Sequence, residues 1–474
     1  MKKIGLGVIT IFLIYSFALS QTMSEPINVS NTPGASKWAQ VAFGPDGIVH
    51  IVWEEDYHDK PGSDIFYVSY DGKKFSEPYN LTNSPSVECE RPYICTSPKG
   101  QIIVVWSQAN GDKIGLREYD PQQKKWLPIE YISKNLGGEE PAVAADKEGN
   151  IYVIWFSEGR VYSRAKINGK WEDVFRMSSV RRSTQVGIVA GKDGKVWAIW
   201  REKQSNGEYK IYYRRRTKKT TWTKAKEMNF GGASQTHPHI AVGPDNVPVV
   251  TYADVDVGHQ AEIWICTINE KDNPREMVIG LALQHYSRIA IDNKGNKHLA
   301  WQIGPGDHGN GIKYTNNIGG EWNTPQLMPN SGGSPKLPGI AADDFGNVAV
   351  VWSSSISGRD KEVWFSSLYP VTPKKFLPPI NLSVSISINN LKRGLEVTYN
   401  LSWEPNPENN DDFIKGYKIY KRENGGKFKQ LVEVSKNTYS ASFTFTDLKN
   451  KIQFGISTVS LSGAESEIVV FGSE

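Results

Sequence analysis

The chain has 474 residues and a formal net charge of +4, with 55 lysines and arginines against 51 aspartates and glutamates. So small a net charge over this length gives no support for a nucleic-acid footprint, and we expect no nucleic-acid partner. Beyond the first 20 residues no segment is apolar enough to span a bilayer, so we expect no transmembrane segment.

The first 20 residues have the pattern of a secretory signal. Two lysines precede an apolar stretch from Ile4 to Ile14, and small residues at 18–20 come before Gln21. The apolar stretch is too short for a membrane-spanning helix, and no cysteine follows it for lipid attachment. We therefore predict a signal peptide at 1–20 and a secreted protein that is periplasmic, extracellular or associated with the cell surface.

Residues 21–375 repeat one unit, in which a turn residue is followed six positions later by a large aromatic. The pairs are Gly47/Trp53, Gly100/Trp106, Gly149/Trp155, Gly194/Trp200, Asn246/Tyr252, Gly295/Trp301 and Gly346/Trp352. Asparagine is the residue that best replaces glycine in a left-handed turn. Successive aromatics lie 53, 49, 45, 52, 49 and 51 residues apart. A period of about 50 residues in β-rich units is typical of a β-propeller, and we predict seven blades within residues 21–375.

The strand between each turn and its aromatic is apolar on both faces, as in 102–106 and 348–352. A strand loses its alternation when both faces are covered, which is the situation of an inner propeller strand. We therefore expect the repeated aromatic to pack between blades rather than to stack on a sugar.

The two ends of the repeat region complement each other. The segment 24–33 closely matches 76–85, which is the fourth strand of the first repeat. The last repeat supplies only three strands, at about 338–343, 347–352 and 361–368. We predict that the N-terminal strand completes the last blade and closes the ring, which removes an exposed sheet edge.

A tail with another pattern occupies residues 376–474. Trp403 ends an early strand, Gly416 to Tyr420 forms another, and Leu448 precedes Phe454 by six positions. These residues resemble a fibronectin type III domain, and the resemblance implies a β-sandwich that serves as a spacer or adhesive module. Phe454 stands where that family usually has its corner tyrosine, so we expect the corner hydrogen bond to be missing.

Two positions of each repeat vary widely while their neighbours are monotonous. Nine residues before the turn the chain has Trp38, Arg91, Glu140, Gln185, His237, Tyr286 and Leu337, and seven before it Gln40, Tyr93, Ala142, Gly187, His239, Arg288 and Gly339. Because the pleat sends both positions to the same side at the start of an inner strand, we expect them to ring one mouth of the channel. The predicted ligand-binding set is Trp38, Arg91, Tyr93, His237, Tyr286 and Arg288. The alternative is a solvated funnel of mixed polarity.

Acidic and basic residues after the repeated aromatics add to the same mouth in this prediction. They are Glu54, Glu55, Asp56, Arg201, Glu202, Asp254, Asp256 and Asp307. His237 and His239, two apart on one strand, would share a face, but such a lone pair is more often a surface or channel feature than a metal site. No phosphate loop and no catalytic motif occurs, and the three cysteines lack zinc-site spacing, so we expect no cofactor and no metal.

Residues 24–370 resemble the sialidase-like superfamily. Ser69 to Gly72 followed by Phe75 is similar to its Asp-box (BNR) repeat, and strand-turn-Trp patterns end at Trp222 and Trp322. Members that are enzymes clamp a carboxylate with three arginines, which the resemblance assigns to Arg91, Arg201 and Arg288. It further implies a Tyr–Glu nucleophile pair, Tyr286 with Glu140 or Glu202, and Asp56 as the acid. Seven predicted blades instead of six, and Arg91-Pro92 without an intervening isoleucine, depart from that family.

These observations favour a non-catalytic recognition protein that binds a glycan or protein ligand at the channel mouth. The alternative is an exo-acting glycoside hydrolase of sialidase type.

Overall fold

The computed structural model describes residues 22–472 apart from 33, 218–220, 229–233, 256–260, 270–274, 283, 305–310, 333–334, 356–359, 372–375, 392–393, 410, 412–413, 447–450 and 462. The predicted signal at 1–20 and Leu448 of the tail lie outside the described residues. Within them all the regular elements are β-strands, so the protein is all-β. Over this same part, the structure contains no helix with the length and hydropathy of a membrane crossing.

The described part of 27–367 forms seven antiparallel sheets of four or five strands, numbered here in chain order. The first contains β2 (Ala35–Phe43), β3 (Val49–Asp56), β4 (Ser63–Tyr70) and β5 (Tyr79–Asn80). The second contains β6 (Cys89–Thr96), β7 (Ile102–Gln108), β8 (Lys113–Asp120), β9 (Lys125–Trp126) and β10 (Glu130–Tyr131). The third contains β11 (Glu139–Ala145), β12 (Ile151–Ser157), β13 (Arg160–Ile167), β14 (Lys170–Trp171) and β15 (Phe175–Arg176). The fourth contains β16 (Ser183–Ala190), β17 (Val196–Lys203), β18 (Tyr209–Arg216) and β19 (Lys226–Glu227).

The fifth to seventh sheets follow the same plan. The fifth contains β20 (Ser234–Val242), β21 (Pro248–Val255), β22 (Ala261–Thr267) and β23 (Arg275–Ala282). The sixth contains β24 (Gln284–Ile291), β25 (Lys297–Ile303), β26 (Gly311–Asn316) and β27 (Gln326–Leu327). The seventh contains β28 (Lys336–Ala342), β29 (Val348–Ser355), β30 (Lys361–Ser367) and, from the start of the chain, β1 (Ile27–Asn28).

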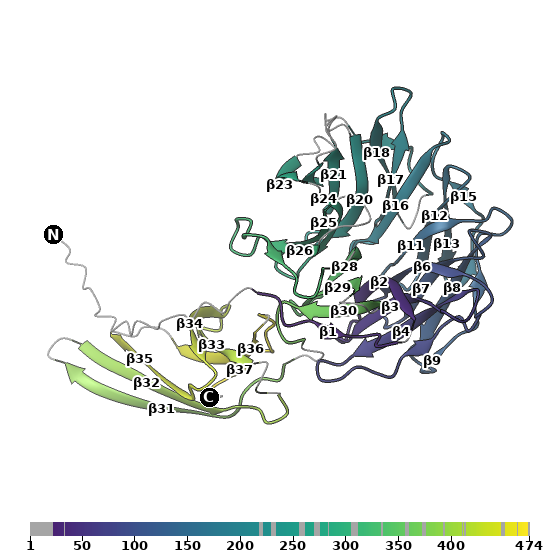
Figure 1. Ribbon diagram of the computed structural model, residues 1–474. Helices are drawn as coiled ribbons and strands as arrows, with labels where there is room; N and C mark the ends of the chain where they lie inside the picture. Colours follow the sequence, from purple (N-terminus) through teal and green to yellow (C-terminus); the bar gives the residue numbers. More distant parts are fainter. Residues whose placement is uncertain are drawn as a thin grey trace.

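The first strands of the seven sheets stand next to one another in a ring. β2 contacts β6, the contacts continue through β11, β16, β20 and β24 to β28, and β28 contacts β2 again. The sheets therefore form a closed ring in a propeller-like arrangement, with their first strands innermost (Figure 1).

The start of the chain pairs with the last strand of the ring. Ile27 of β1 pairs with Phe365 of β30, and Val29 N–H donates to the carbonyl of Val363 at 2.8 Å. The pairing predicted from the match between 24–33 and 76–85 is therefore present.

The repeated turn and aromatic positions behave as predicted. All seven turn residues have a positive φ, from 61° at Asn246 to 84° at Gly295. All seven aromatics are completely buried, and Trp106 packs against Val52 and Ile65 of the preceding sheet. The large rings therefore fill the space between sheets, and none is exposed to stack on a sugar.

The tail forms two further antiparallel sheets. One has the order β31 (Ile380–Leu391), β32 (Gly394–Glu404), β35 (Ser440–Thr446), and the other β34 (Lys429–Ser435), β33 (Ile414–Glu423), β36 (Ile452–Ser460), β37 (Val469–Val470). Their shared core includes Trp403, Tyr417 and Phe454. Because Phe454 has no hydroxyl, no corner hydrogen bond forms at this position.

Candidate functional site

Each of the seven inner strands contains a β-bulge close to its start. In β2, two residues between Lys37 and Gln40 face the single residue Trp53 of β3, and the same register shift recurs in the other six inner strands. The first bulged residue is the position nine before the turn. In six sheets this residue has a φ between 47° and 56°, and none of the six is glycine. A left-handed backbone at a bulky residue costs about 1–2 kcal/mol.

The positions nine and seven before the turn do converge, but not for the reason expected from the sequence. We expected a regular pleat to point both side chains to the same side of the strand. Instead, the extra residue of the bulge changes the direction of the side chain nine before the turn. The sequence carried a sign of this bulge, because Pro92, Pro141, Pro238 and Pro338 follow the bulged residue in four repeats. Proline lacks an N–H group and within sheets is confined to edges and bulges.

The bulged backbone is held by side chains of the preceding sheet. Arg91 N–H donates to Glu54 Oε2 at 3.1 Å, and Glu140 N–H donates to Ser107 Oγ at 3.1 Å. His237 N–H donates to Gln185 Oε1 at 2.7 Å. Burial raises the pKa of Glu54 to about 7. These bonds fix the direction of each bulged side chain.

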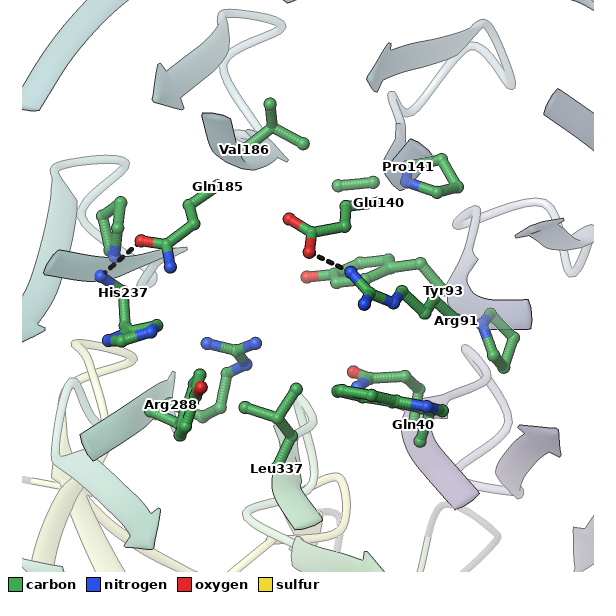
Figure 2. Close-up of a pocket in the computed structure, with 15 residues that line it drawn as sticks. Gln40, Arg91, Tyr93, Glu140, Pro141, Gln185, Val186, His237, Arg288 and Leu337 are labelled. Atoms are coloured by element: carbon green, nitrogen blue, oxygen red, sulfur yellow. Dashed lines mark hydrogen bonds and ion pairs between the residues drawn. The ribbon is translucent and has the colours of Figure 1, made fainter. Parts of the chain in front are cut away.

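The variable positions of different sheets meet in one cavity of about 120 Å³, which we call the mouth cavity. Figure 2 shows their side chains converging from the surrounding strands. The cavity is lined by Trp38, Gln40, Arg91, Pro92, Tyr93, Glu140, Pro141, Ala142, Gln185, Val186, His237, Pro238, Tyr286, Arg288 and Leu337. All six residues of the predicted ligand-binding set are among them. Glu140, Gln185, Gln40 and Leu337 were not chosen, although they occupy the same two repeat positions.

A hydrogen bond across the channel lies one layer below the bulged residues. Tyr93 of the second sheet and His239 of the fifth approach to 3.3 Å between Oη and Nε2. His239 Nδ1 accepts from Ile289 N–H at 3.2 Å, so the ring proton is on Nε2 and is donated to Tyr93. Burial, with Arg288 nearby, holds the pKa of His239 well below its usual range, so the ring is neutral. The Tyr93 hydroxyl keeps its own hydrogen to donate.

Arg288 brings to this layer a positive charge that has no ion pair of its own, although the carboxylate of Glu140, which Arg91 holds, acts on it through space. Its guanidinium is half-buried and points toward the centre of the cavity (Figure 2). Its Nε has no partner among the described residues, and its one hydrogen bond is a long one of 3.4 Å to the carbonyl of Ser287. Burial lowers the pKa of Arg288, but guanidinium stays protonated at neutral pH. A buried charge without a partner is costly, so this position is suited to an anion.

The other charged groups of the rim are paired or stacked. Arg91 donates to Glu140, and its guanidinium lies 5.0 Å from the ring centre of Trp38. The rings of His237 and Tyr286 lie 3.9 Å apart between centroids. Arg201, just outside the lining, lies over Tyr209 at 4.1 Å, and its Nε is also without a partner among the described residues.

The prediction that acidic residues after the aromatics reach the mouth is wrong for most of those described. Glu55 is buried and accepts from Ser36 Oγ and Trp53 Nε1, and Glu202 is buried and accepts from Trp200 Nε1. Asp56 is ion-paired with Lys37. Asp256 and Asp307 lie outside the described residues. Strand pairing continues past each aromatic, so Glu55 and Glu202 turn into the sheets instead of the channel, while Asp56 lies at the partly exposed end of β3.

His237 and His239 do not act as a pair. The bulge between Thr236 and His239 separates their directions, so the former lines the rim and the latter the layer below. Among the described residues no group of three or more His, Cys, Asp or Glu side chains is placed to hold a metal ion. Cys89, Cys95 and Cys266 are free thiols.

Comparison with known proteins extends to the fold only. No family model and no curated protein matches the chain. Among solved structures it is similar to a fungal alcohol oxidase determined in complex with copper, at 10% identity and a TM-score of 0.51, over 95% of this chain and 98% of that one. This likeness shows a shared fold and nothing about activity.

Two further solved structures are similar at lower scores. A protein of unknown function from Dyadobacter fermentans is 14% identical over 73% of this chain and 98% of its own, with a TM-score of 0.47. A polysaccharide lyase described as an ulvan lyase is 12% identical over 73% of this chain and 96% of its own, with a TM-score of 0.49. Neither value is high enough to carry an argument about function.

Proposed function

We propose that the chain is a secreted, non-catalytic recognition protein that holds an acidic glycan in the mouth cavity. In this proposal the seven sheets are the blades of a closed seven-bladed propeller over residues 21–375, following a signal peptide at 1–20. Residues 376–474 are a fibronectin type III domain that acts as a spacer or second contact. The strand orders β31-β32-β35 and β34-β33-β36-β37, packed over Trp403, support that last assignment.

The half-buried and unpaired guanidinium of Arg288 is the observation that carries the proposal. It lies beside the Tyr93 hydroxyl, which is free to donate because His239 already donates to it. This layer therefore offers donors and positive charge without an acceptor of matching charge. A carboxylate or sulfate group is the complement of such a set, since charge-assisted hydrogen bonds to oxyanions are the strong ones.

The rim supplies contacts suited to the rest of a sugar. Trp38 and Tyr286 present aromatic rings, which pack on the apolar faces of pyranoses. Gln185 uses its carbonyl for the backbone of His237, so its amide hydrogens remain available to hydroxyl groups. A cavity of about 120 Å³ is smaller than the pockets of about 300–1,000 Å³ that usually enclose a ligand, so it suits one terminal group of a glycan rather than an extended chain.

An array of sialylated, uronate-containing and sulfated glycans tests the proposal, with Arg288→Ala as the decisive variant. We expect it to weaken binding of the best acidic glycan by about 1.5–3 kcal/mol, the contribution of a charged hydrogen bond. Its melting temperature should stay equal or rise, because the substitution removes a half-buried cation that has no ion pair. Arg91→Ala should lose less, since Glu140 already neutralises that side chain, and Arg176→Ala, an exposed arginine of β15, is the matched control.

Unchanged binding in Arg288→Ala, or an array on which only protein partners or neutral glycans bind at the mouth, would contradict the proposal. The rival is an exo-acting sialidase-type hydrolase. Against it stand the engagement of Glu140 by Arg91, of Glu202 by Trp200 and of Asp56 by Lys37. Turnover of a fluorogenic sialoside at ordinary enzyme concentration would establish the rival instead.

A further inference from the structure

A tryptophan that follows the third strand recurs in four of the described sheets and serves as an internal comparison. Three of them donate the indole N–H to the preceding sheet: Trp171 to Glu130 at 2.7 Å, Trp222 to Ser163 at 2.9 Å and Trp322 to Glu276 at 2.7 Å. Each bond seals the outer part of the seam between two sheets. The fourth, Trp126, has no such bond to the first sheet or to any other described residue.

A cleft of about 540 Å³ lies at the seam that Trp126 leaves open, between the first and second sheets. We call it the seam cleft and define it by Asp46, Tyr67, Glu77, Tyr79, Tyr119 and Trp126. Trp126 meets Tyr67 and Tyr119 edge-on, at 5.1 and 5.6 Å between ring centroids. The ring of Tyr79 is nearly parallel to Trp126, at 9°, and is 44% exposed. The cleft thus presents aromatic faces and edges from both sheets.

Among these rings, hydrogen-bond donors and acceptors are open to solvent and have no protein partner among the described residues. The Trp126 indole N–H and the hydroxyls of Tyr79 and Tyr119 have no partner among the described residues. The exposed carboxylate of Glu77 is likewise unbonded, whereas His50 is tied to the Tyr67 hydroxyl at 2.8 Å. Burial lowers the pKa of His50 to about 4, so this ring is neutral at pH 7.

We propose that the seam cleft binds a neutral oligosaccharide, at a site separate from the mouth cavity. Sugar hydroxyls both donate and accept, so they need the carboxylate and the N–H and O–H donors that the cleft offers together. Sugar rings also present apolar C–H faces, which pack on tyrosine and tryptophan.

The mixture of donors and acceptors distinguishes this ligand from a proline-rich peptide, the other common partner of an aromatic groove. A proline-rich segment presents carbonyl acceptors only and would leave the carboxylate of Glu77 without a donor. The cleft contains the carboxylates of Asp46 and Glu77 against the single ammonium of Lys124, so its charges do not favour a strongly anionic ligand. No residue lines both the seam cleft and the mouth cavity, so occupation of one does not require the other.

Saturation-transfer NMR on the full chain with maltohexaose, cellohexaose, xylohexaose and mannohexaose tests the proposal. We expect at least one hexaose to bind, and Tyr79→Ala and Trp126→Phe each to weaken it at least fivefold. Tyr79 is exposed and Trp126→Phe keeps the packed ring, so both variants should fold. Tyr131→Ala, an exposed tyrosine of β10, and Trp171→Phe are the matched controls and should bind as the unaltered protein does.

Arg288→Ala separates this site from the proposed function of the mouth. It should leave hexaose binding unchanged even if acidic glycans are lost, and failure of the mouth proposal would not alter the hexaose result. The seam-cleft proposal is overturned if none of the four hexaoses binds, or if binding persists in Tyr79→Ala. It is also overturned if decaproline, and not a hexaose, shows the dependence on Tyr79 and Trp126.

Discussion

The inner strands have a left-handed backbone at two places, at the bulge that faces the mouth and at the turn that follows the strand at its other end. At the turn, six of the seven residues are glycine, which adopts this conformation without strain. At the bulge, six of the seven are left-handed and every one of these carries a large side chain. The left-handed conformation therefore causes no strain at the glycines of the turns, but costs about 1–2 kcal/mol at each bulged residue. The difference indicates that the bulged residues are retained for the contacts that their side chains make at the mouth, whereas the turn residues are retained for their backbone conformation.

We expect the largest difference in the free energy of unfolding between a substitution of a buried repeat aromatic and a substitution of an aromatic at the rim of the mouth. Trp301→Ala should lower the free energy of unfolding by about 3–5 kcal/mol, because a fully buried ring leaves a cavity between two sheets. Tyr286→Ala, at the half-buried rim, should cost less than half as much. Urea unfolding of both variants measures the difference. Equal losses would show that the rim is as much a part of the core as the repeated aromatics are.

Glu54 and Ser107 hold equivalent bulges, but only Glu54 titrates. Burial raises its folded-state pKa from the ordinary value of 4.5 to about 7. Between these two pH values the unfolded chain loses the Glu54 proton while the folded protein keeps it. The free energy of unfolding is therefore highest below pH 4.5 and falls as the pH rises to 7. Glu54→Gln should therefore gain stability relative to the unaltered protein between these values, by up to about 3 kcal/mol. Unfolding free energies at pH 5 and pH 8 check this. A difference that does not change with pH would exclude a raised pKa.

The smallest effect tests the strain at the bulge directly. Gln185→Ala and Gln185→Gly lose the same side-chain contacts, but only the alanine keeps the left-handed strain, so the glycine variant should be the more stable by about 1 kcal/mol. At neighbouring Thr184, in ordinary strand geometry, alanine should be the more stable by about 0.5–1 kcal/mol. Thermal unfolding of the four variants suffices. The same order at both positions would mean that the bulge stores no strain.

Much of the ring could be predicted because it depends on local features that recur. The left-handed turns, the buried aromatics and the pairing of β1 with β30 follow from glycine spacing, apolar runs and one repeated segment. The mouth position of Arg91 and Arg288 followed from the same repeat, since equivalent positions of a ring face the same channel.

Interactions between sheets were beyond the reach of the sequence. The bond between Tyr93 and His239 depends on the width of the channel, which no local pattern reports. Glu55 and Glu202 were expected at the mouth because they follow the aromatics, but they bond back to the indole N–H of Trp53 and Trp200. The missing bond of Trp126 becomes visible only beside the three seams where the equivalent bond is made.

Because Ile27 pairs with Phe365, the ring of sheets closes only after both ends of the repeat region have been synthesised. β1 is among the first segments to leave the ribosome, and its partner β30 is the last strand of the ring to leave it, ahead of the C-terminal tail. At about 5–20 residues per second, the interval between them is roughly 20–70 seconds. During that time the first six sheets are made one after another, and the ring stays open until β30 has been made. A chaperone or protease that meets the nascent chain therefore meets an unclosed molecule, and the last few strands decide when it becomes resistant.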